Sequence, residues 1–561
     1  MDVSEMQKKL SQWATENPHE PYRELYHLLC NDVWLRVAAT ETLKHKGSAT
    51  AGIDGMTKSN FDGNFDGYIA ELREALKAQS FEPLPVKRVY IPKPNSEKKR
   101  PLGIPILFDR IVQNALRMIL EPIWEVDFSK HSYGFRPNRS TYDTMTYIAK
   151  RFAAPGGDSY QWVIEGDITS YFDTIPHRRL MKAVKKRVAD RKIRDLLWKF
   201  LRAGVMYQGE VQETMTGTPQ GGIVSPLAAN IYLHELDTYM ESNSLNLSPY
   251  QRERRRKQGS SNFLYVRYAD DFVVLCNGTK AQALAMKEEL GGVLSTMGLT
   301  LSEEKTKVTH ISEGFDFLGY RVKRCMGRNG KMVTKVLIPD KAIKKFRHKM
   351  RSIISPSTTK RSFNAVITAQ NALTRGWCEY YRCTNSPSKA FRKLSDELYW
   401  LTAHWLGRKY KTSIPAIMRK YLKGNTFGTD TRKLVRPDEY KAKRFVAKSW
   451  HNPYTETEKV QEEKDRIKRE SLFSYDQLWD GQESRQGRMD LREETLLRDG
   501  PICAACKKTF HPYEVHVDHI IARVRFKDPR KADRLENQQV LCIDCHRAKT
   551  KTDLKVLSRM P

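Results

Sequence analysis

Apolar positions along the chain follow two spacings, which predict two kinds of element. Three stretches repeat apolar side chains at the helical spacing: residues 69–79, 111–125 and 284–297. Three others are short, continuous apolar runs rich in β-branched and aromatic side chains: residues 162–168, 263–266 and 272–276. Runs of that length and composition are typical of buried strands. The pattern therefore predicts an α+β fold.

Basic residues accompany several of these elements. Residues 86–94 alternate as a strand with a basic face, and residues 98–105 follow as a second strand, so together they predict a basic hairpin. Such a hairpin is either a grip for a triphosphate or a solvated edge of a sheet. Residues 252–257 predict a solvated basic loop, and residues 317–320 predict another short strand.

Positive charge dominates the composition. At 561 residues, with 40% hydrophobic residues, the chain is long enough for about three or four domains. Lysine and arginine number 97 against 66 for aspartate and glutamate, and residues 407–450 alone hold 13 cations against 3 acids. The net charge of +31 points to a polyanionic partner, above all a nucleic acid.

A membrane partner fits the chain less well than a nucleic acid. No apolar run approaches the roughly 18 residues that a spanning helix needs. The N-terminus, which begins Met1-Asp2-Val3, has no leader or transit pattern. We therefore expect a soluble, cytoplasmic protein that acts without a membrane.

Two adjacent carboxylates, Asp270 and Asp271, separate the last two apolar runs. On their own they would also suit the turn of a surface hairpin. A third acid, Asp167, lies in the first apolar run, at the end of its predicted strand. Buried carboxylates are costly unless a cation offsets them, and two divalent ions held by converging carboxylates can join a nucleotide to a 3′ end. Lys93 and Arg100 of the basic hairpin offer charge for the incoming triphosphate.

These features occur in the order of a known motif series. The motifs are 91–94 (IPKP), 100–105 (RPLGIP), 134–137 (GFRP), 167–173 (DITSYFD), 217–222 (GTPQGG), 268–271 (YADD) and 317–320 (FLGY). Together they resemble the motifs of group II intron-encoded reverse transcriptases, or maturases, over about residues 20–330. The resemblance implies a right-hand polymerase with fingers and palm over residues 1–335. It also implies an α-helical thumb, or maturase domain, over 336–425 and a basic DNA-binding region and linker over 426–490.

The resemblance carries roles onto matching residues. It makes Asp167, Asp270 and Asp271 the ligands of two catalytic Mg²⁺ ions. It makes Lys93 and Arg100 contacts of the triphosphate, which agrees with the charge argument above.

Two further residues take roles from the same resemblance. Gln220 belongs to a glycine-rich loop, whose glycines allow a base pair to approach the backbone, and becomes a contact near the nascent pair. Phe172 becomes the residue that crowds a ribose 2′ oxygen and so favours deoxynucleotides; it can also simply pack. The aromatic cluster at 375–381 (RGWCEYY) is interpreted first as core packing and second as a stacking surface for RNA.

Four of the nine cysteines form two Cys-x-x-Cys pairs near the C-terminus: Cys503, Cys506, Cys542 and Cys545. This spacing indicates a closed, tetrahedral, structural zinc site rather than disulfides. The other five cysteines are scattered, and core or surface packing accounts for them.

Metal-binding and basic side chains lie between and beside these pairs: Asp518, His519, Asn537 and His546. Over residues 491–561 the constellation resembles the HNH, or ββα-metal, endonucleases; the alternative is a purely structural zinc module. The resemblance makes His519 the general base. Asp518, Asn537 and His546 become candidate ligands of one divalent ion, Mg²⁺ or similar, and Asn537 alternatively orients His519.

The two resemblances together predict a multifunctional group II intron protein. It would bind intron RNA to assist splicing, cut one strand of a target DNA, and extend the new 3′ end with deoxynucleoside triphosphates on the intron template. Two other interpretations stay open: a splicing-only, RNA-binding maturase, and a reverse transcriptase of the retron or diversity-generating class. The sequence leaves the intron, the DNA site, the nuclease metal and the choice of monomer or dimer undetermined.

Overall fold

The computed structural model describes residues 2–92, 99–153, 160–207, 210–212, 216–218, 221–326 and 332–471, and in the C-terminal part 495–496, 498–510, 515–522, 526, 532 and 534–557. The chain divides into two compact units, residues 1–472 and 473–561. Helices and strands are mixed in both units, so the predicted multidomain α+β class is confirmed.

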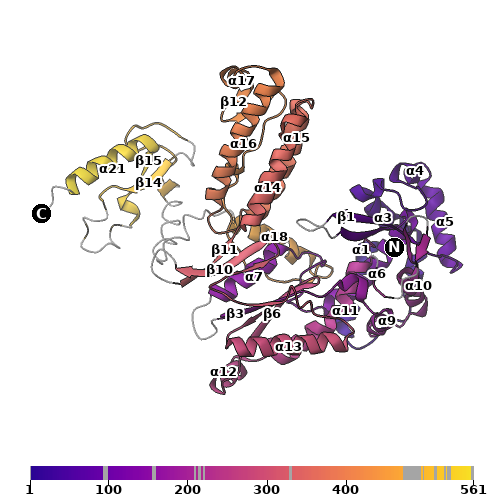
Figure 1. The fold of residues 1–561 in the computed structure, drawn as a ribbon. Helices are drawn as coiled ribbons and strands as arrows, with labels where there is room; N and C mark the ends of the chain where they lie inside the picture. The colour runs from indigo at the N-terminus through magenta and orange to yellow at the C-terminus, as the bar shows by residue number, and fades with distance from the viewer. Residues whose placement is uncertain are drawn as a thin grey trace. The chain divides into compact units, whose positions relative to one another are not determined.

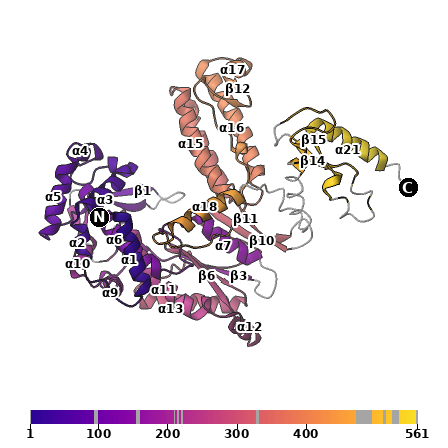
Figure 2. The ribbon, with the colours of Figure 1, turned by 180° about the vertical axis from the view of Figure 1, so that it is seen from behind.

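A four-stranded antiparallel sheet, called the central sheet below, forms the middle of the first unit. Its strands are β6 (Phe263–Tyr268), β7 (Asp271–Cys276), β3 (Trp162–Gly166) and β8 (Lys307–His310), in that order. The middle residues of β3 and β7 are fully buried because helices cover both faces of the sheet. Figures 1 and 2 show α7 (Thr141–Ala153) along one face and α13 (Lys280–Thr296) along the other.

Helices before and around this sheet build the rest of its core. The N-terminal group is α1 (Val3–Glu16), α2 (Tyr26–Leu29), α3 (Asp32–Lys44), α4 (Lys58–Asp62), α5 (Phe65–Lys77) and α6 (Leu107–Asp127). Between β3 and β6 the chain forms α8 (Tyr171–Thr174), α9 (His177–Lys185), α10 (Arg191–Arg202), α11 (Ser225–Met240) and α12 (Pro249–Lys257). The helix α12 corrects our prediction of a loop at 252–257. It forms because Ser248 and Gln251 make a capping box and Pro249 starts the first turn.

The predicted basic hairpin is an antiparallel pair within a second sheet. Strand β1 (Val86–Pro92) pairs with β2 (Lys99–Ile104), and Arg100 lies opposite Ile91. Strands β4 (Val205–Tyr207) and β5 (Glu210–Gln212) extend the sheet on the other side of β1.

A third sheet contains β9 (Phe315–Phe317), β10 (Tyr320–Met326) and β11 (Met332–Leu337). The strand predicted at 317–320 is instead the turn between β9 and β10. Leu318 and Gly319 have φ values of +48° and +77°, which end the extended conformation.

A helical bundle follows, with its own apolar core. It consists of α14 (Asp340–Ile353), α15 (Phe363–Tyr381), α16 (Pro387–Tyr410) and α17 (Ile414–Tyr421), followed by the short strands β12 (Leu422–Lys423) and β13 (Thr426–Phe427). Two tyrosines join the bundle to the third sheet: Tyr380 donates to the carbonyl of Leu318 at 2.5 Å, and Tyr381 to that of Gly319 at 3.0 Å. The aromatic cluster at 375–381 therefore serves in packing, as expected first.

The first unit ends in an extended segment and a helix, α18 (Thr457–Ser471). The second unit contains an antiparallel pair, β14 (Val515–His519) and β15 (Gln538–Cys542), followed by α21 (Ile543–Leu557). Within the described ranges, no helix is long and apolar enough to cross a membrane.

Candidate active sites

The three predicted aspartates lie at one end of the central sheet. Asp270 and Asp271 belong to the tight turn between β6 and β7, called the acidic turn (residues 268–271), in which Ala269 has a φ of +58°. Gly166, the last residue of β3, pairs with Phe272, so Asp167 follows directly beside this turn. Glycine is needed there, because a Cβ at position 166 would lie 2.2 Å from the ring of Phe272.

The aspartates act on one another electrostatically. Burial, with added repulsion from Asp167, raises the pKa of Asp270. Burial and the charges of Asp270 and Asp167 raise the pKa of Asp271 to about 6. The charged forms of Asp270 and Asp271 are thus destabilised by burial and by neighbouring carboxylates, which is the situation that a bound cation relieves.

Two cations partly offset this negative charge. Lys305 Nζ lies 2.8 Å from Asp167 Oδ2, and sequence reasoning did not identify this lysine. The charge of Arg100 acts in the opposite direction to burial, toward lower pKa values of Asp270 and Asp271, so the charge of the basic hairpin reaches the acidic turn.

A fully buried ion pair between Arg267 and Asp237 contacts the acidic turn. The guanidinium of Arg267 donates to both carboxylate oxygens of Asp237, at 2.7 and 2.5 Å, and neither side chain is exposed. The third guanidinium nitrogen, Nη1, donates to Asn230 Oδ1 and to the carbonyl of Ala269, both at 2.9 Å. One side chain therefore links α11 to the turn that carries Asp270.

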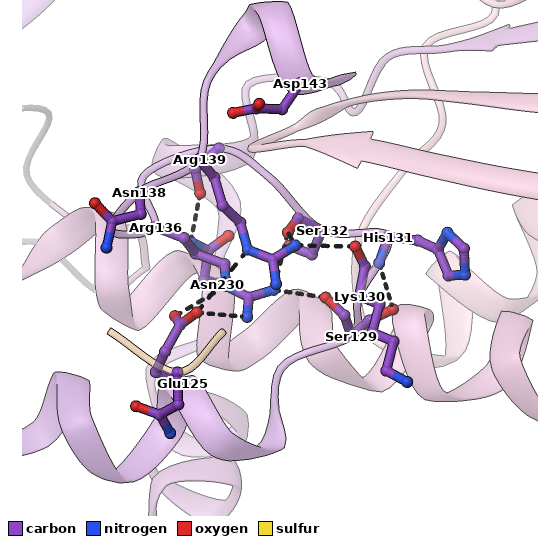
Figure 3. A network of polar contacts seen from close by, with 12 residues as sticks. Glu125, Ser129, Lys130, His131, Ser132, Arg136, Asn138, Arg139, Asp143 and Asn230 are labelled. Atoms are coloured by element: carbon purple, nitrogen blue, oxygen red, sulfur yellow. Dashed lines mark hydrogen bonds and ion pairs between the residues drawn. The ribbon is translucent and has the colours of Figure 1, made fainter. Parts of the chain in front are cut away.

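Residues 129–139, called the support loop, lie against the same turn. The backbone of His131 accepts from Arg267 N–H and Tyr133 N–H donates to Arg267 O, both at 2.9 Å. Gly134 packs so closely that a Cβ there would lie 2.3 Å from the nitrogen of Ala269. Figure 3 shows how Arg136 holds this loop together, through Glu125 of α6 at 2.8 and 2.9 Å and through two loop carbonyls.

The predicted substrate contacts are only partly described. Phe172 lies half-buried on α8, edge-on to the exposed ring of Phe135 with 6.4 Å between centroids, and its carbonyl accepts from Thr218 N–H at 2.6 Å. It therefore lies at the edge of the glycine-rich loop. Lys93 and Gln220 lie outside the described residues.

The second unit brings the four predicted cysteines together. The ligand atoms of Cys503, Cys506, Cys542 and Cys545 all lie within 4.8 Å of one another. In the described part of the chain this is the one group of three or more His, Cys, Asp or Glu side chains with metal-site spacing; the three aspartates of the first unit do not meet that criterion. Four converging thiols are the donor set of a structural zinc site.

The predicted nuclease residues lie on the strand pair and the helix after it. Asp518 and His519 end β14, Asn537 directly precedes β15, and His546 lies on α21. The side chain of Asp518 is 3.2 Å from Lys549 Nζ, a lysine that sequence reasoning missed.

Two details refine the roles of these residues. The side-chain amide of Asn537 bonds to the backbone: it accepts from Ile521 N–H at 2.9 Å and donates to the carbonyls of Ile521 and Ala532 at 3.1 and 2.9 Å. These contacts tie the side chain of Asn537 to the backbone just after His519, and whether Asn537 is a metal ligand or orients His519 stays a prediction. His516 adds a third imidazole, stacked on that of His546 with 4.9 Å between ring centroids.

Three family models match the chain. They are reverse transcriptase (RNA-dependent DNA polymerase) over residues 91–322, the group II intron maturase-specific domain over 343–422, and HNH endonuclease over 503–552.

Among curated relatives, protein YkfC of Escherichia coli is 41% identical over 370 residues, which cover 63% of this chain and 97% of YkfC. The group II intron-encoded protein LtrA of Lactococcus lactis is 34% identical over 444 residues, which cover 67% of this chain and 73% of LtrA. A putative COX1/OXI3 intron 1 protein of Saccharomyces cerevisiae is 30% identical over 403 residues, or 65% of this chain and 46% of that protein.

Proposed function

Because the chain belongs to the group II intron-encoded proteins, with reverse transcriptase, maturase and HNH endonuclease domains, we propose that it copies its intron into a nicked DNA target. The maturase domain implies that intron RNA is one partner. Target DNA and deoxynucleoside triphosphates are the partners that the proposal adds. The HNH module would cut one DNA strand, and the polymerase would extend the resulting 3′ end with the intron as template.

Architecture and domain limits follow from the same proposal. Residues 1–335 would form the fingers and palm of a right-hand polymerase, and 336–425 the thumb. Residues 426–490 would contain the DNA-binding region and linker, and 491–561 a ββα-metal nuclease. The first unit, which ends at residue 472, would thus hold the polymerase and part of the DNA-binding region.

The observation that carries the polymerase proposal is the convergence of Asp167 with Asp270 and Asp271. The pKa values of Asp270 and Asp271 are raised by burial and by the charges of neighbouring aspartates, and a pair of Mg²⁺ ions would offset that buried negative charge. When bound, such ions stabilise negative charge on the attacking 3′ oxygen and on the leaving pyrophosphate. The chain itself would hold those ions, attract the triphosphate through Arg100 and exclude a ribose 2′ hydroxyl with Phe172. Lys93 and Gln220 would complete the contacts to the triphosphate and the nascent pair.

The nuclease proposal rests on the position of His519 at the end of β14, next to the chain that Asn537 fixes. His519 would take a proton from the attacking water. Asp518 and His546 would hold a divalent ion, and Asn537 would act through position. The four cysteines would bind zinc and keep the ends of this small module together.

Primer extension on an RNA template tests the polymerase proposal. The wild type should incorporate deoxynucleotides, and Asp270→Asn should abolish incorporation while leaving RNA binding intact. A splicing-only maturase would incorporate nothing in either form. In parallel, His519→Ala should abolish nicking of the DNA target without reducing extension from a supplied primer, which separates the two activities.

A further inference from the structure

The extended segment that follows the helical bundle is bonded at several points to earlier parts of the first unit. We call residues 443–454 the strap. Its backbone bonds to Tyr142, whose hydroxyl donates to Arg444 O at 2.6 Å and accepts from Val446 N–H at 2.8 Å. Farther along, Asn452 Nδ2 donates to Ser11 Oγ at 2.9 Å. The strap thus crosses from the bundle to the first helix of the chain.

One side chain of the strap contacts the support loop directly. The indole of Trp450 lies under the guanidinium of Arg139, 4.1 Å from ring centroid to Cζ, and edge-on to the ring of Tyr133 at 5.6 Å. Lys448, two residues before, donates to the carbonyl of Asn138. At 4.1 Å the cation and the aromatic face are in full contact, so the indole restricts where Arg139 can point.

Arg139 passes this restraint into the support loop. Its guanidinium donates to the carbonyls of Lys130 and Ser132, at 2.9 and 3.2 Å (Figure 3). Ser132 is also the residue that forms an isolated bridge with Arg267 of β6. Two residues, Arg139 and Ser132, therefore link Trp450 to the strand that leads into the acidic turn.

The acidic turn has little freedom to move relative to the support loop. Gly134 lies against the nitrogen of Ala269, and Asn230 bonds both to Gly134 O at 2.8 Å and to Arg267. A displacement of the loop must therefore displace the residue before Asp270, because closely packed groups transmit strain rather than absorb it.

We propose that Trp450 is a positioning residue of the polymerase site, which acts through Arg139 and the support loop on the acidic turn. The inference rests on the proposed polymerase activity. It gives residues 443–454, which lie within the segment expected to bind DNA, a role inside the first unit as well.

The test compares full-length Trp450→Ala and Trp450→Phe with Asn452→Ala, a matched control that releases the strap at Ser11 without touching the support loop. Trp450→Ala should lower kcat for primer extension about tenfold with little change in the KM for deoxynucleotide, because small misplacements of reacting groups act on the chemical step. Trp450→Phe should restore most of the rate, and Asn452→Ala should keep it.

Hydrogen exchange and a double variant supply readouts that general loss of stability would not produce. In Trp450→Ala, exchange should rise at residues 131–134 and 267–271. Arg139→Lys should lower kcat as Trp450→Ala does, and the double variant should be little worse than either single one, since both changes interrupt the same contact. Faster exchange confined to the strap, with wild-type kcat, would overturn the proposal, as would fully additive losses.

Exchange also separates this inference from the proposed function. It reports the coupling between strap and turn even in a protein that does not extend a primer. An inactive wild type would therefore refute the polymerase proposal, and the exchange pattern would still decide the role of Trp450.

Discussion

Replacement of Asp237 by alanine should destabilise the first unit strongly. Asp237 and Arg267 are both fully buried, and Asp237 accepts two hydrogen bonds from the guanidinium and a third from Tyr265 at 3.0 Å. Burial acts to lower the pKa of Arg267, but Asp237 outweighs it and raises that pKa above its ordinary value. Without Asp237 the buried guanidinium keeps its neutral acceptors but loses its counter-charge, which costs about 3–5 kcal/mol.

Thermal unfolding measures that cost. At roughly 2.1 cal/mol/K per residue, the unfolding entropy of a unit of 472 residues is about 1 kcal/mol/K. A loss of about 3–5 kcal/mol therefore lowers the Tm by about 3–5 °C. Asp195→Ala is the control, because Asp195 makes an exposed pair with Arg191 at 3.5 Å and exposed pairs contribute at most about 1 kcal/mol.

A double variant separates stability from positioning. Asp237→Leu with Arg267→Met removes both charges, which should recover most of the Tm. Primer extension should stay impaired, because the carbonyl of Ala269 has lost its donor. A single Asp237→Ala variant that melts within 1 °C of the wild type would refute the reasoning, and so would a double variant with full activity.

Three further outcomes are expected. Asp109 is buried, and Leu84 N–H donates to one of its carboxyl oxygens at 3.2 Å. Burial raises the pKa of Asp109 to about 8. Because the folded state holds this proton more tightly than the unfolded state, the free energy of unfolding falls as the pH rises from about 4 to about 8. Asp109→Asn should therefore melt above the wild type at pH 8 and alongside it at pH 4, and a pH-independent difference would contradict this. Cys506→Ser should reduce bound zinc, measured per mole of protein, and expose residues 498–557 to protease while primer extension continues; unchanged zinc content would count against the four-cysteine site. Phe172→Ala should lower the ratio of kcat/KM for deoxynucleotides over ribonucleotides, and an unchanged ratio would leave Phe172 with a packing role alone.

Local patterns were sufficient for much of the fold. The strands that carry the three aspartates follow from short apolar runs, and the basic hairpin follows from alternation closed by prolines. The four cysteines come together as their paired spacing indicates. In each case the residues that determine the element or the site lie close together in the sequence, or one residue type recurs at a fixed spacing.

The remaining features depend on partners that are far apart in the sequence. Arg267 was visible as a single arginine in an apolar run, but its partner Asp237 lies 30 residues away on another element. From the sequence, the basic strap was predicted to bind DNA. Its contacts with the first unit, such as that of Tyr142 with Arg444, join residues 302 positions apart, and no local pattern indicates them. The prediction of a loop at 252–257 was wrong for another reason. The run of like charges was interpreted as a loop, and the capping box that starts a helix just before it was overlooked.

The anchors of the strap also set the order in which the protein is completed as it leaves the ribosome. Ser11 is synthesised well before Asn452, its partner, which follows 441 positions later. At about 5–20 residues per second, roughly 20–90 s pass between synthesis of Ser11 and synthesis of Asn452. The helix α1 is thus made long before it gains its final neighbours, so translation must pass the helical bundle before this helix is secured.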